Sequence, residues 1–516
     1  MSGRKILIDT NVFVGLEDQK EVPPNFAKLQ QLCGQHSVRV FVHEAAVEDI
    51  RRDRDHERQK ISLSKVKKFE QLAKIKPPDP DELSKHFGPV TKPNDSVDVA
   101  LLYALRIGVV DFLVTQDEGI HVRARRCSPP LADRVLTVAD AVAWLSSTYE
   151  PKEVRLPLVE EVPAHAIPID DEIFESLREG YPEFARWWRE TCVPNHRQCW
   201  VSTVDDELAG LVVRKDETHA EACTRHIGPK ILKICTFKVK LKFRGEKLGE
   251  LLLKQILWFA SKNSYDLVYL TTFSDQIFLI QVLEYFGFQK TGVNTFEEEI
   301  YEKSLLRARL EATPMADIFE LARNNYPRFV ARTPARAFCV PIKGEYHNML
   351  FPELATRRQG DLFHAAGLAV AGGTPRTPGN TIRKVYLCRA RTRALARGDV
   401  LLFYRSKSPD YLASQSATSI GVVEAVSEAS NLDDLIRLTA KRSVYSTQQL
   451  QAILTASSES VKVIDFLLIG HLDPVVPLDE LNRDQVFSGR PPQSICNLSH
   501  NRFKPILRRI NFGFEV

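Results

Sequence analysis

The order of apolar and polar residues divides the chain into three parts, and the first part alternates short apolar runs with amphipathic segments. Strands are predicted at 6–14, 38–42 and 109–115, and helices at 44–76, 95–107 and 138–145. Strands that alternate with helices pair in parallel, so this part is expected to form a parallel α/β sheet.

The middle part has longer alternating segments, and the last part loses its helical periodicity. In the middle part, strands are predicted at 199–204, 208–215, 230–241 and 267–273, with helices at 172–189, 249–262 and 276–286. In the last part, strands are predicted at 384–389, 399–404, 419–425 and 461–469. These patterns favour an α+β domain followed by a mostly β barrel.

Proline marks the boundary after the first part. Pro151, Pro157, Pro163 and Pro168 fall within 149–170 and indicate a linker. We therefore predict an α/β multidomain chain, with a domain at 1–149, a linker at 150–170, a domain at 171–306, a connecting segment at 307–337 and a domain at 338–516.

The composition agrees with several folded domains, because 516 residues exceed the roughly 150 residues of one domain. No apolar run reaches the ~20 residues that span a bilayer, and the first residues lack the apolar stretch of a signal peptide. The nine cysteines are scattered without a CxxC pair, which indicates reduced thiols. We expect a cytoplasmic protein without a membrane partner. The net charge of +4 is too small to indicate a nucleic-acid partner.

Carboxylates follow the predicted strands of the first part. Asp9 lies in ILIDTNVF, Asp98 in NDSVDVALLYAL and Asp117 in FLVTQDEGI. A further acid comes from the start of the second helix, where the candidates are Glu44, Glu48 and Asp49. Acids gathered at one edge of a sheet repel one another unless cations neutralise them. A few carboxylates can hold Mg²⁺ or Mn²⁺, which can activate water against a phosphodiester.

These pieces (LIDTNV, the acid of VEDI, the acid of DVALLYAL, and VTQD) resemble the PIN family of ribonucleases over 1–149. The resemblance implies a metal-dependent endoribonuclease whose metal and catalytic set is Asp9, Asp49, Asp98 and Asp117. At the second position the family favours Glu, whereas Asp49 aligns here and Glu48 is adjacent.

A basic segment follows the second of these acids. Its basic residues are Arg51, Arg52, Arg54, Arg58, Lys65, Lys67 and Lys68. They could follow an RNA backbone. Interleaved acids equally favour a solvated helix face, and the sequence leaves both interpretations open.

The middle part contains FKVKLKFRGEKLGELLLK, a strand that runs through a glycine-containing turn into an amphipathic helix. The N-terminus of a helix presents unpaired N–H groups that bind phosphate well. Arg244 adds positive charge, and Gly245 and Gly249 permit close approach of a ligand. Alone, such a turn could equally be an ordinary basic entry to a helix.

The order of strand, Arg-Gly turn, helix, strand, helix and Gly-Phe resembles the GNAT N-acetyltransferase superfamily over about 169–293. The resemblance implies an acyltransferase that binds acetyl-CoA, with its pyrophosphate at the turn and its acyl group near the preceding strand. The implied cofactor-binding residues are Phe237, Val239, Arg244, Gly245, Lys247 and Gly249.

Two positions depart from the family pattern. Lys247 replaces the middle glycine of Arg/Gln-x-x-Gly-x-Gly/Ala, and could still reach a phosphate if its backbone angles permit. Leu283 stands where many members carry the tyrosine that protonates the thiolate, and the nearby Tyr285 should point elsewhere on its helix. Binding of acetyl-CoA is therefore a firmer prediction than acetyl transfer. Candidate general bases are Glu217, His219 and Glu221.

Cysteine and histidine residues of the middle part suggest a zinc site that their spacing does not support. The residues are Cys192, His196, Cys199, Cys223 and His226. Because no zinc signature matches, buried thiols and surface histidines are the better interpretation.

The last part, with LARGDVLLFYRS and SIGVVEAV, resembles the PUA-like barrel superfamily, which includes ASCH and EVE domains, over 338–516. The resemblance implies binding of RNA or a modified base. Candidate contacts are Arg383, Lys384, Tyr404 and Arg405, although solvent-facing strand residues explain them equally well.

Three hypotheses follow. In the first, the chain is an acyltransferase that uses acetyl-CoA and whose flanking domains recruit or cut RNA; its amine acceptor is unknown. In the second, it is a metal-dependent ribonuclease whose GNAT-like core senses acyl-CoA. In the third, it is a non-catalytic RNA-binding scaffold.

Overall fold

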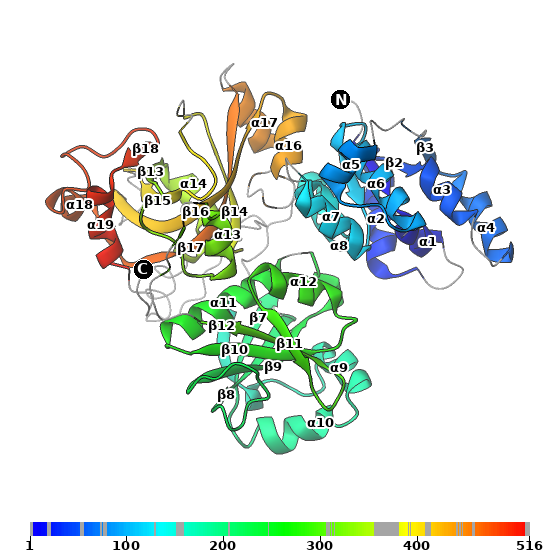
Figure 1. Cartoon of the computed structure of the whole chain (residues 1–516), viewed down its shortest axis with the longest axis horizontal. Coiled ribbons are helices and arrows are strands. Elements are labelled where there is room, and N and C mark those ends of the chain that lie inside the picture. Colours follow the sequence, from blue (N-terminus) through cyan, green and yellow to red (C-terminus); the bar gives the residue numbers. More distant parts are fainter. Residues whose placement is uncertain are drawn as a thin grey trace.

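The computed structural model places three β-sheets in three lobes (Figure 1). It describes residues 4–510 apart from 18–21, 52–55, 73–74, 76–79, 128–130, 151–158, 205–206, 246, 306–309, 311, 314, 355–380, 391, 393, 408–413, 440–441, 443–444, 446 and 457–459. Among the helices of these residues, none combines the length and the apolar character needed to cross a membrane.

The first sheet is parallel throughout, with strand order β3-β2-β1-β4-β5. Its strands are β1 (Lys5–Ile8), β2 (Arg39–His43), β3 (Glu70–Leu72), β4 (Phe112–Val114) and β5 (Val135–Leu136). The helices are α1 (Thr10–Glu17), α2 (Pro24–Gln35), α3 (Glu44–Ile50), α4 (His56–Val66), α5 (Pro80–Phe87), α6 (Pro93–Arg106), α7 (Glu118–Arg126) and α8 (Val138–Tyr149). Strands covered on both faces have continuous apolar runs, which explains the buried sequence of β1 and β4.

The second sheet has seven strands in the order β11-β12-β10-β9-β8-β7-β6, and only β9 and β10 are parallel neighbours. The strands are β6 (Val159–Pro163), β7 (Gln198–Val204), β8 (Glu207–Glu217), β9 (Ile231–Val239), β10 (Leu267–Thr272), β11 (Gln289–Val293) and β12 (Glu299–Ser304). The helices are α9 (Glu175–Gly180), α10 (Phe184–Trp187), α11 (Leu248–Lys262) and α12 (Ile277–Tyr285).

The third sheet has six strands in the order β14-β17-β16-β15-β13-β18. They are β13 (Ala337–Ile342), β14 (Arg383–Cys388), β15 (Val400–Arg405), β16 (Ser416–Ala429), β17 (Val461–Pro477) and β18 (Cys496–Leu498). The helices of this part are α13 (Ile318–Asn324), α14 (Gly344–Leu350), α16 (Leu432–Thr439), α17 (Thr447–Thr455), α18 (Leu478–Arg483) and α19 (His500–Arg508). Within the described residues the end strands β14 and β18 do not pair with each other, so the closed barrel that we expected is not found there.

The second and third sheets share one apolar core. Leu252 and Ile256 of α11 belong to the same buried cluster as Leu467 and Ile469 of β17. At this junction the indole Nε1 of Trp258 donates to the hydroxyl of Tyr326 at 2.8 Å, and that hydroxyl donates to the carbonyl of Leu468 at 2.9 Å. Helix α11 is therefore held between the two sheets.

The structure differs from the predicted elements at several places, including the helix predicted over 172–189, which is divided into α9 and α10. Helix α1 begins at Thr10, so the first strand ends before Asp9 instead of continuing to residue 14. The helix predicted over 44–76 is divided into α3, α4 and the strand β3. Strand β6 lies in the segment predicted as a linker and pairs with β7 at the edge of the second sheet, a position that tolerates the proline at its end.

Candidate acyl-CoA site and carboxylate edge

Strands β9 and β10 separate half-way along the second sheet. They pair in parallel only as far as Ile234 and Leu270. Beyond this point β9 continues along β8 to Val239, whereas β10 continues along β12. In the part of the chain described, the stretch of β9 that carries Phe237 and Val239 thus has no strand partner on its β10 side. Backbone N–H and C=O groups on such an edge can hydrogen-bond an extended ligand.

Helix α11 begins beside this edge with a left-handed turn. Lys247 is its N-cap, with φ 61° and ψ 17°, and Gly245 has φ 92°. Position 247 therefore requires the conformation that glycine adopts most easily, and lysine adopts it here. Across the described residues, the N–H groups of Leu248 and Gly249 donate no hydrogen bond. Such groups, with the helix dipole, favour an anion.

Two positive side chains lie near this turn. Arg244 is exposed and forms no ion pair with the residues described. The Nζ atom of Lys238 on β9 donates to the hydroxyl of Ser176. Burial, together with the nearby positive charge of Arg244, lowers the pKa of Lys238. The turn therefore has a positive potential that an anionic ligand would relieve.

Helix α8 of the first lobe contacts the same turn. The Nζ atom of Lys247 lies 2.8 Å from Oδ1 of Asp140. A Cβ atom at Gly245 would lie only 2.4 Å from the carbonyl oxygen of Ala139. Lys247 therefore does not point freely at a phosphate, because its ammonium group is already paired with a carboxylate of another lobe.

Leu283 and Tyr285 both lie on α12. Leu283 is buried in α12, with 1% of its surface exposed. The hydroxyl of Tyr285 lies 3.4 Å from Glu424 of β16, and the guanidinium groups of Arg323 and Arg383 lie 4.5 and 4.9 Å from the centre of its ring. The prediction that Tyr285 points elsewhere is confirmed, because this side chain faces the third sheet.

The three candidate bases lie at the far end of the second sheet. Glu217 pairs in register with Ile231. Phe237 is six residues further along β9, which corresponds to about 20 Å. His219 is exposed, and Glu221 accepts hydrogen bonds from Thr218 within a turn. The carboxylate of Glu217 accepts from the hydroxyl of Tyr269, which pairs with Lys233 one residue before β9 and β10 separate. His219 and Glu221 follow the end of β8.

A different carboxylate lies at that point. Glu298 is 8% exposed. Its Oε1 atom accepts from the hydroxyl of Tyr181 at 2.7 Å, and its Oε2 atom accepts from Thr271 and Asn294, each at 2.8 Å. Thr271 is the first residue of β10 beyond its pairing with β9. Glu298 forms no ion pair within the described residues, so neutral donors alone hold this buried carboxylate.

Sequence reasoning did not identify Glu298 or its partners. They come from three separated segments: the turn after α9, the end of β10, and the turn between β11 and β12. The only local signal is Asn294, whose side chain accepts from the N–H groups of Phe296 and Glu298. Such an asparagine turn predicts a hairpin and gives no information about a site.

The carboxyl edge of the first sheet carries the predicted acids. Asp9 follows β1 and is 7% exposed. Its Oδ2 atom accepts from Thr115 and Asn11, each at 2.7 Å. Asp117 follows β4 and caps α7 by accepting from the N–H of Ile120 at 3.1 Å. The carboxylate of Asp9 is thus linked through Thr115 to the backbone of Asp117, because the hydroxyl of Thr115 also accepts from the N–H of Asp117 at 2.9 Å.

Asp98 of α6 completes the group of carboxylates that the structure describes. Burial, and then the charges of Asp117 and Asp9, raise its pKa to about 7, despite Arg123 nearby. The side chain of Asp49 lies outside the described residues. Within the described part of the chain, no set of three or more acidic, histidine or cysteine side chains is arranged to hold a metal ion. The metal set therefore stays a prediction.

Some predicted RNA contacts also lie outside the described residues. They are Arg52, Arg54 and the side chain of Arg58. In the third sheet, Lys384, Tyr404 and Arg405 are at most 4% exposed. Lys384 donates to the carbonyl of Leu350 at 2.8 Å. The guanidinium of Arg383 is bonded to Glu424. Lys384, Tyr404 and Arg405 are therefore structural, and their prediction as an RNA surface is wrong. Arg383 is partly exposed, and its predicted contact stays a prediction.

Part of the chain matches a known family. Residues 163–288 match the Acetyltransferase (GNAT) family. This GNAT segment contains the separating strands β9 and β10 and the turn before α11. No curated protein matches the chain.

Several solved structures show slight likeness to the chain. An acetyltransferase from Bacillus subtilis, in complex with CoA, is 18% identical over 29% of this chain and 100% of its own, with a TM-score of 0.23. The PaiA N-acetyltransferase from Thermoplasma acidophilum, in complex with coenzyme A, is 14% identical over 29% of this chain and 99% of its own, with a TM-score of 0.23. The ASCH protein from Zymomonas mobilis is 16% identical over 33% of this chain and 94% of its own, with a TM-score of 0.22.

Proposed function

We propose that the chain is an N-acyltransferase that uses acetyl-CoA as its donor. The observation that carries this proposal is the unpaired N-terminus of α11 beside the separation of β9 and β10, within the segment that matches the GNAT family. Bound acetyl-CoA would supply an activated acyl thioester. The acceptor that we propose is a primary amine that carries a positive charge.

The residues present fit this cofactor. The N–H groups of Leu248 and Gly249, with Arg244, would hold its pyrophosphate. The open edge of β9 near Phe237 and Val239 would hold the amide-containing arm that leads to the thioester. Each of these groups lacks a protein partner on the relevant side among the described residues, so each can bind the ligand without breaking an existing contact.

Glu298 suits an acceptor that carries a positive charge. Its carboxylate accepts three hydrogen bonds from neutral groups, which leaves room for one further donor on Oε1. A buried carboxylate without a countercharge attracts an ammonium group and can remove its proton. We therefore assign Glu298 as the contact of a primary amine and Tyr181 as the residue that positions it.

Replacing Arg244 with alanine should weaken acetyl-CoA binding about tenfold, the loss expected for one charge-assisted hydrogen bond of roughly 1.4 kcal/mol. Isothermal titration calorimetry of the full chain measures this directly. Lys242→Ala is the matched control, because Lys242 is an exposed cation two residues away that is paired with Glu207. The control should bind like wild type.

Replacing Asp140 should increase the affinity for acetyl-CoA. Asp140 places a carboxylate beside the turn and neutralises Lys247. Asp140→Asn should therefore strengthen acetyl-CoA binding several-fold. Absence of acetyl-CoA binding by the wild type at high protein concentration would exclude the transferase.

A second function is favoured by one specific observation, the electrostatic coupling of Asp98 with Asp117 and Asp9. Carboxylates that raise one another's pKa suit a divalent cation. We infer an Mg²⁺- or Mn²⁺-dependent ribonuclease as the alternative, with the GNAT segment sensing acyl-CoA; a non-catalytic scaffold is the third possibility.

Incubating RNA with the full chain and Mn²⁺ tests the nuclease. Cleavage is expected in wild type, and both Asp9→Asn and Asp98→Asn should reduce it by at least about a hundredfold, because each removes a charged ligand from the metal site. Asp95→Asn is the control, since Asp95 caps the start of the same helix as Asp98. Intact structured and single-stranded RNA after incubation with wild type would refute this alternative.

A further inference from the structure

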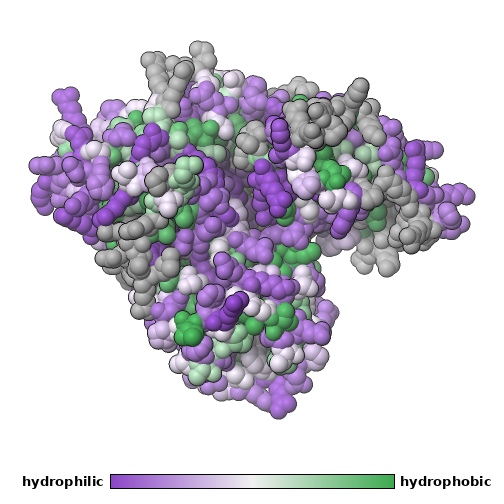
Figure 2. All heavy atoms as spheres, in the orientation of Figure 1, coloured by the Kyte–Doolittle hydropathy of each residue, from purple (hydrophilic) through white to green (hydrophobic). Residues whose placement is uncertain are grey.

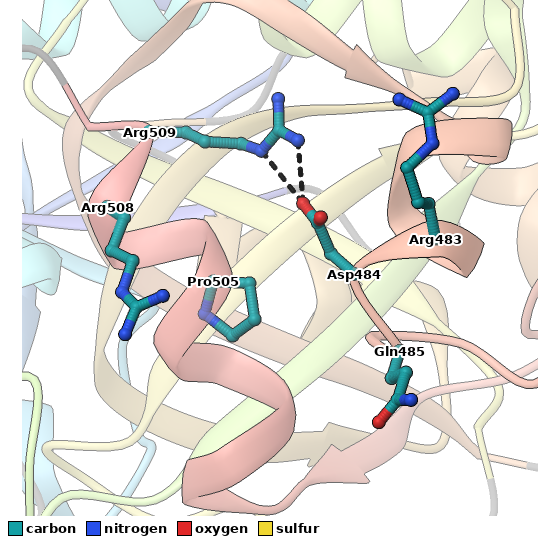
Figure 3. Close-up of a pocket in the computed structure, with 6 residues that line it drawn as sticks. All are labelled: Arg483, Asp484, Gln485, Pro505, Arg508 and Arg509. Carbon is teal, nitrogen blue, oxygen red and sulfur yellow. Dashed lines mark hydrogen bonds and ion pairs between the residues drawn. The ribbon is translucent and has the colours of Figure 1, made fainter.

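Helices α18 and α19 form the walls of an open cavity at one end of the third lobe. The cavity has a volume of about 390 Å³. Six residues line it: Arg483, Asp484, Gln485, Pro505, Arg508 and Arg509 (Figure 3). None of the sequence-derived hypotheses refers to these residues.

The arginines of this cavity have two different roles. Arg509 donates from Nε and Nη2 to Oδ2 of Asp484, at 3.0 and 2.6 Å, and also pairs with Glu480 (Figure 3). It therefore fixes the two helices to each other. Arg483 and Arg508 are exposed, and neither forms an ion pair with any described residue. Two unpaired guanidinium groups thus border the cavity from opposite helices.

The surrounding segment is strongly basic. Residues 485–510 contain five arginine or lysine residues and no aspartate or glutamate. Besides those of the cavity, the exposed basic residues are Arg490, Arg502 and Lys504. The chain as a whole carries only +4, so the positive charge here is concentrated locally. Planar guanidinium groups bind phosphate through two parallel hydrogen bonds.

The geometry points to a binding site for the phosphodiester backbone of single-stranded RNA between α18 and α19. Arg483 and Arg508 would each contact a phosphate. The Oδ1 atom of Asp484 accepts no hydrogen bond among the described residues. A free acceptor in the cavity can take a 2′-hydroxyl, which RNA has and DNA lacks. The side-chain amide of Gln485 can contact a base edge.

An anionic membrane surface fits this region less well. Membrane-surface helices combine basic residues with large apolar side chains that enter the lipid. The large apolar residues exposed on the described chain include none between residues 478 and 510. In the face drawn in Figure 2, the end of the lobe where Figure 1 places α18 and α19 is largely hydrophilic.

The test is the binding of a fluorescent single-stranded RNA to the full chain in a chelating buffer, which prevents metal-dependent cleavage. The double variant Arg483→Gln/Arg508→Gln should bind about tenfold more weakly, and the salt dependence of log K should fall by about 1.4 for two lost phosphate contacts. The control Arg186→Gln/Arg225→Gln removes the same charge from exposed positions of the second lobe and should leave both quantities unchanged.

Further measurements separate this site from other interpretations. A DNA strand of the same sequence should bind more weakly than RNA, and Asp484→Asn should reduce that difference. Equal loss of RNA binding in the two double variants would overturn the proposal, as would equal affinity for RNA and DNA. Binding to vesicles of anionic lipid without binding to RNA would also overturn it. Acetyl-CoA binding in the Arg483→Gln/Arg508→Gln variant should match wild type, because this cavity is independent of the acyl-CoA site.

Discussion

Replacing Asp98 with asparagine should raise the free energy of unfolding by about 2 kcal/mol at pH 8 when metals are chelated. Asp98 is 18% exposed, and burial with the neighbouring Asp117 and Asp9 raises its pKa to about 7. At pH 8 its charge is therefore unfavourable in the folded protein. Asparagine keeps the shape of the side chain and removes that charge.

The direction in which stability changes with pH follows from the pKa of Asp98 in the unfolded and in the folded protein. The ordinary pKa of this aspartate is 3.8, and the folded value is about 7. Between these values the folded state binds more protons, so the stability supplied by protonated Asp98 is present below pH 4 and lost as the pH rises through 7. The difference between the two pKa values corresponds to at most about 4 kcal/mol of unfolding free energy. Because Asp98 is partly exposed to solvent, we expect about 2 kcal/mol. Urea denaturation from pH 4 to 8 measures it.

The pKa of Asp95, on the same helix, is shifted in the opposite direction to that of Asp98. Its carboxylate accepts from the N–H groups of Thr91 and Lys92, and these hydrogen bonds hold its pKa below the ordinary value. Asp95→Asn should therefore destabilise the protein at pH 8, with the loss disappearing in acid. If Asp98→Asn is equally destabilising at every pH, the carboxylates do not repel one another as the structure indicates.

The sequence predicted those parts of the fold that local patterns determine. The apolar run before Asp9 required a buried strand, and the turn at Gly245 required a helix start, because each depends on neighbouring residues only. Helix α11 was predicted to within one residue of its observed start. Lys247 adopts a left-handed conformation in this turn, and the sequence could not show its pairing with Asp140 of the first lobe.

Contacts between distant segments could not be predicted in the same way. Lys384 and Arg405 resemble solvent-facing residues of alternating strands, yet both are buried and donate hydrogen bonds to residues of α14. The basic surface of α18 and α19 was missed since its two unpaired arginines are separated by 25 positions. The cavity that both arginines line depends on the ion pairs of Arg509, which only the folded chain forms.

Replacing Glu298 with glutamine should lower kcat for acetylation of a primary amine by about 10²–10⁴, the usual contribution of a general base. Glutamine keeps the size of the side chain and one acceptor oxygen but cannot take a proton. Release of free CoA, measured over a panel of primary amines, provides the assay. Acetyl-CoA binding should be unchanged, because Arg244 and the start of α11 are not altered.

Two further variants, at Glu297 and Tyr181, distinguish a catalytic role of Glu298 from a structural one. Glu297→Gln changes the neighbouring carboxylate, which is exposed, and should leave kcat within about twofold of wild type. Tyr181→Phe removes the donor to Oε1 of Glu298 and should raise KM more than it lowers kcat, since it alters the position of the carboxylate and not its chemistry. A Glu298→Gln variant that binds acetyl-CoA and turns over at the wild-type rate would remove Glu298 from the site.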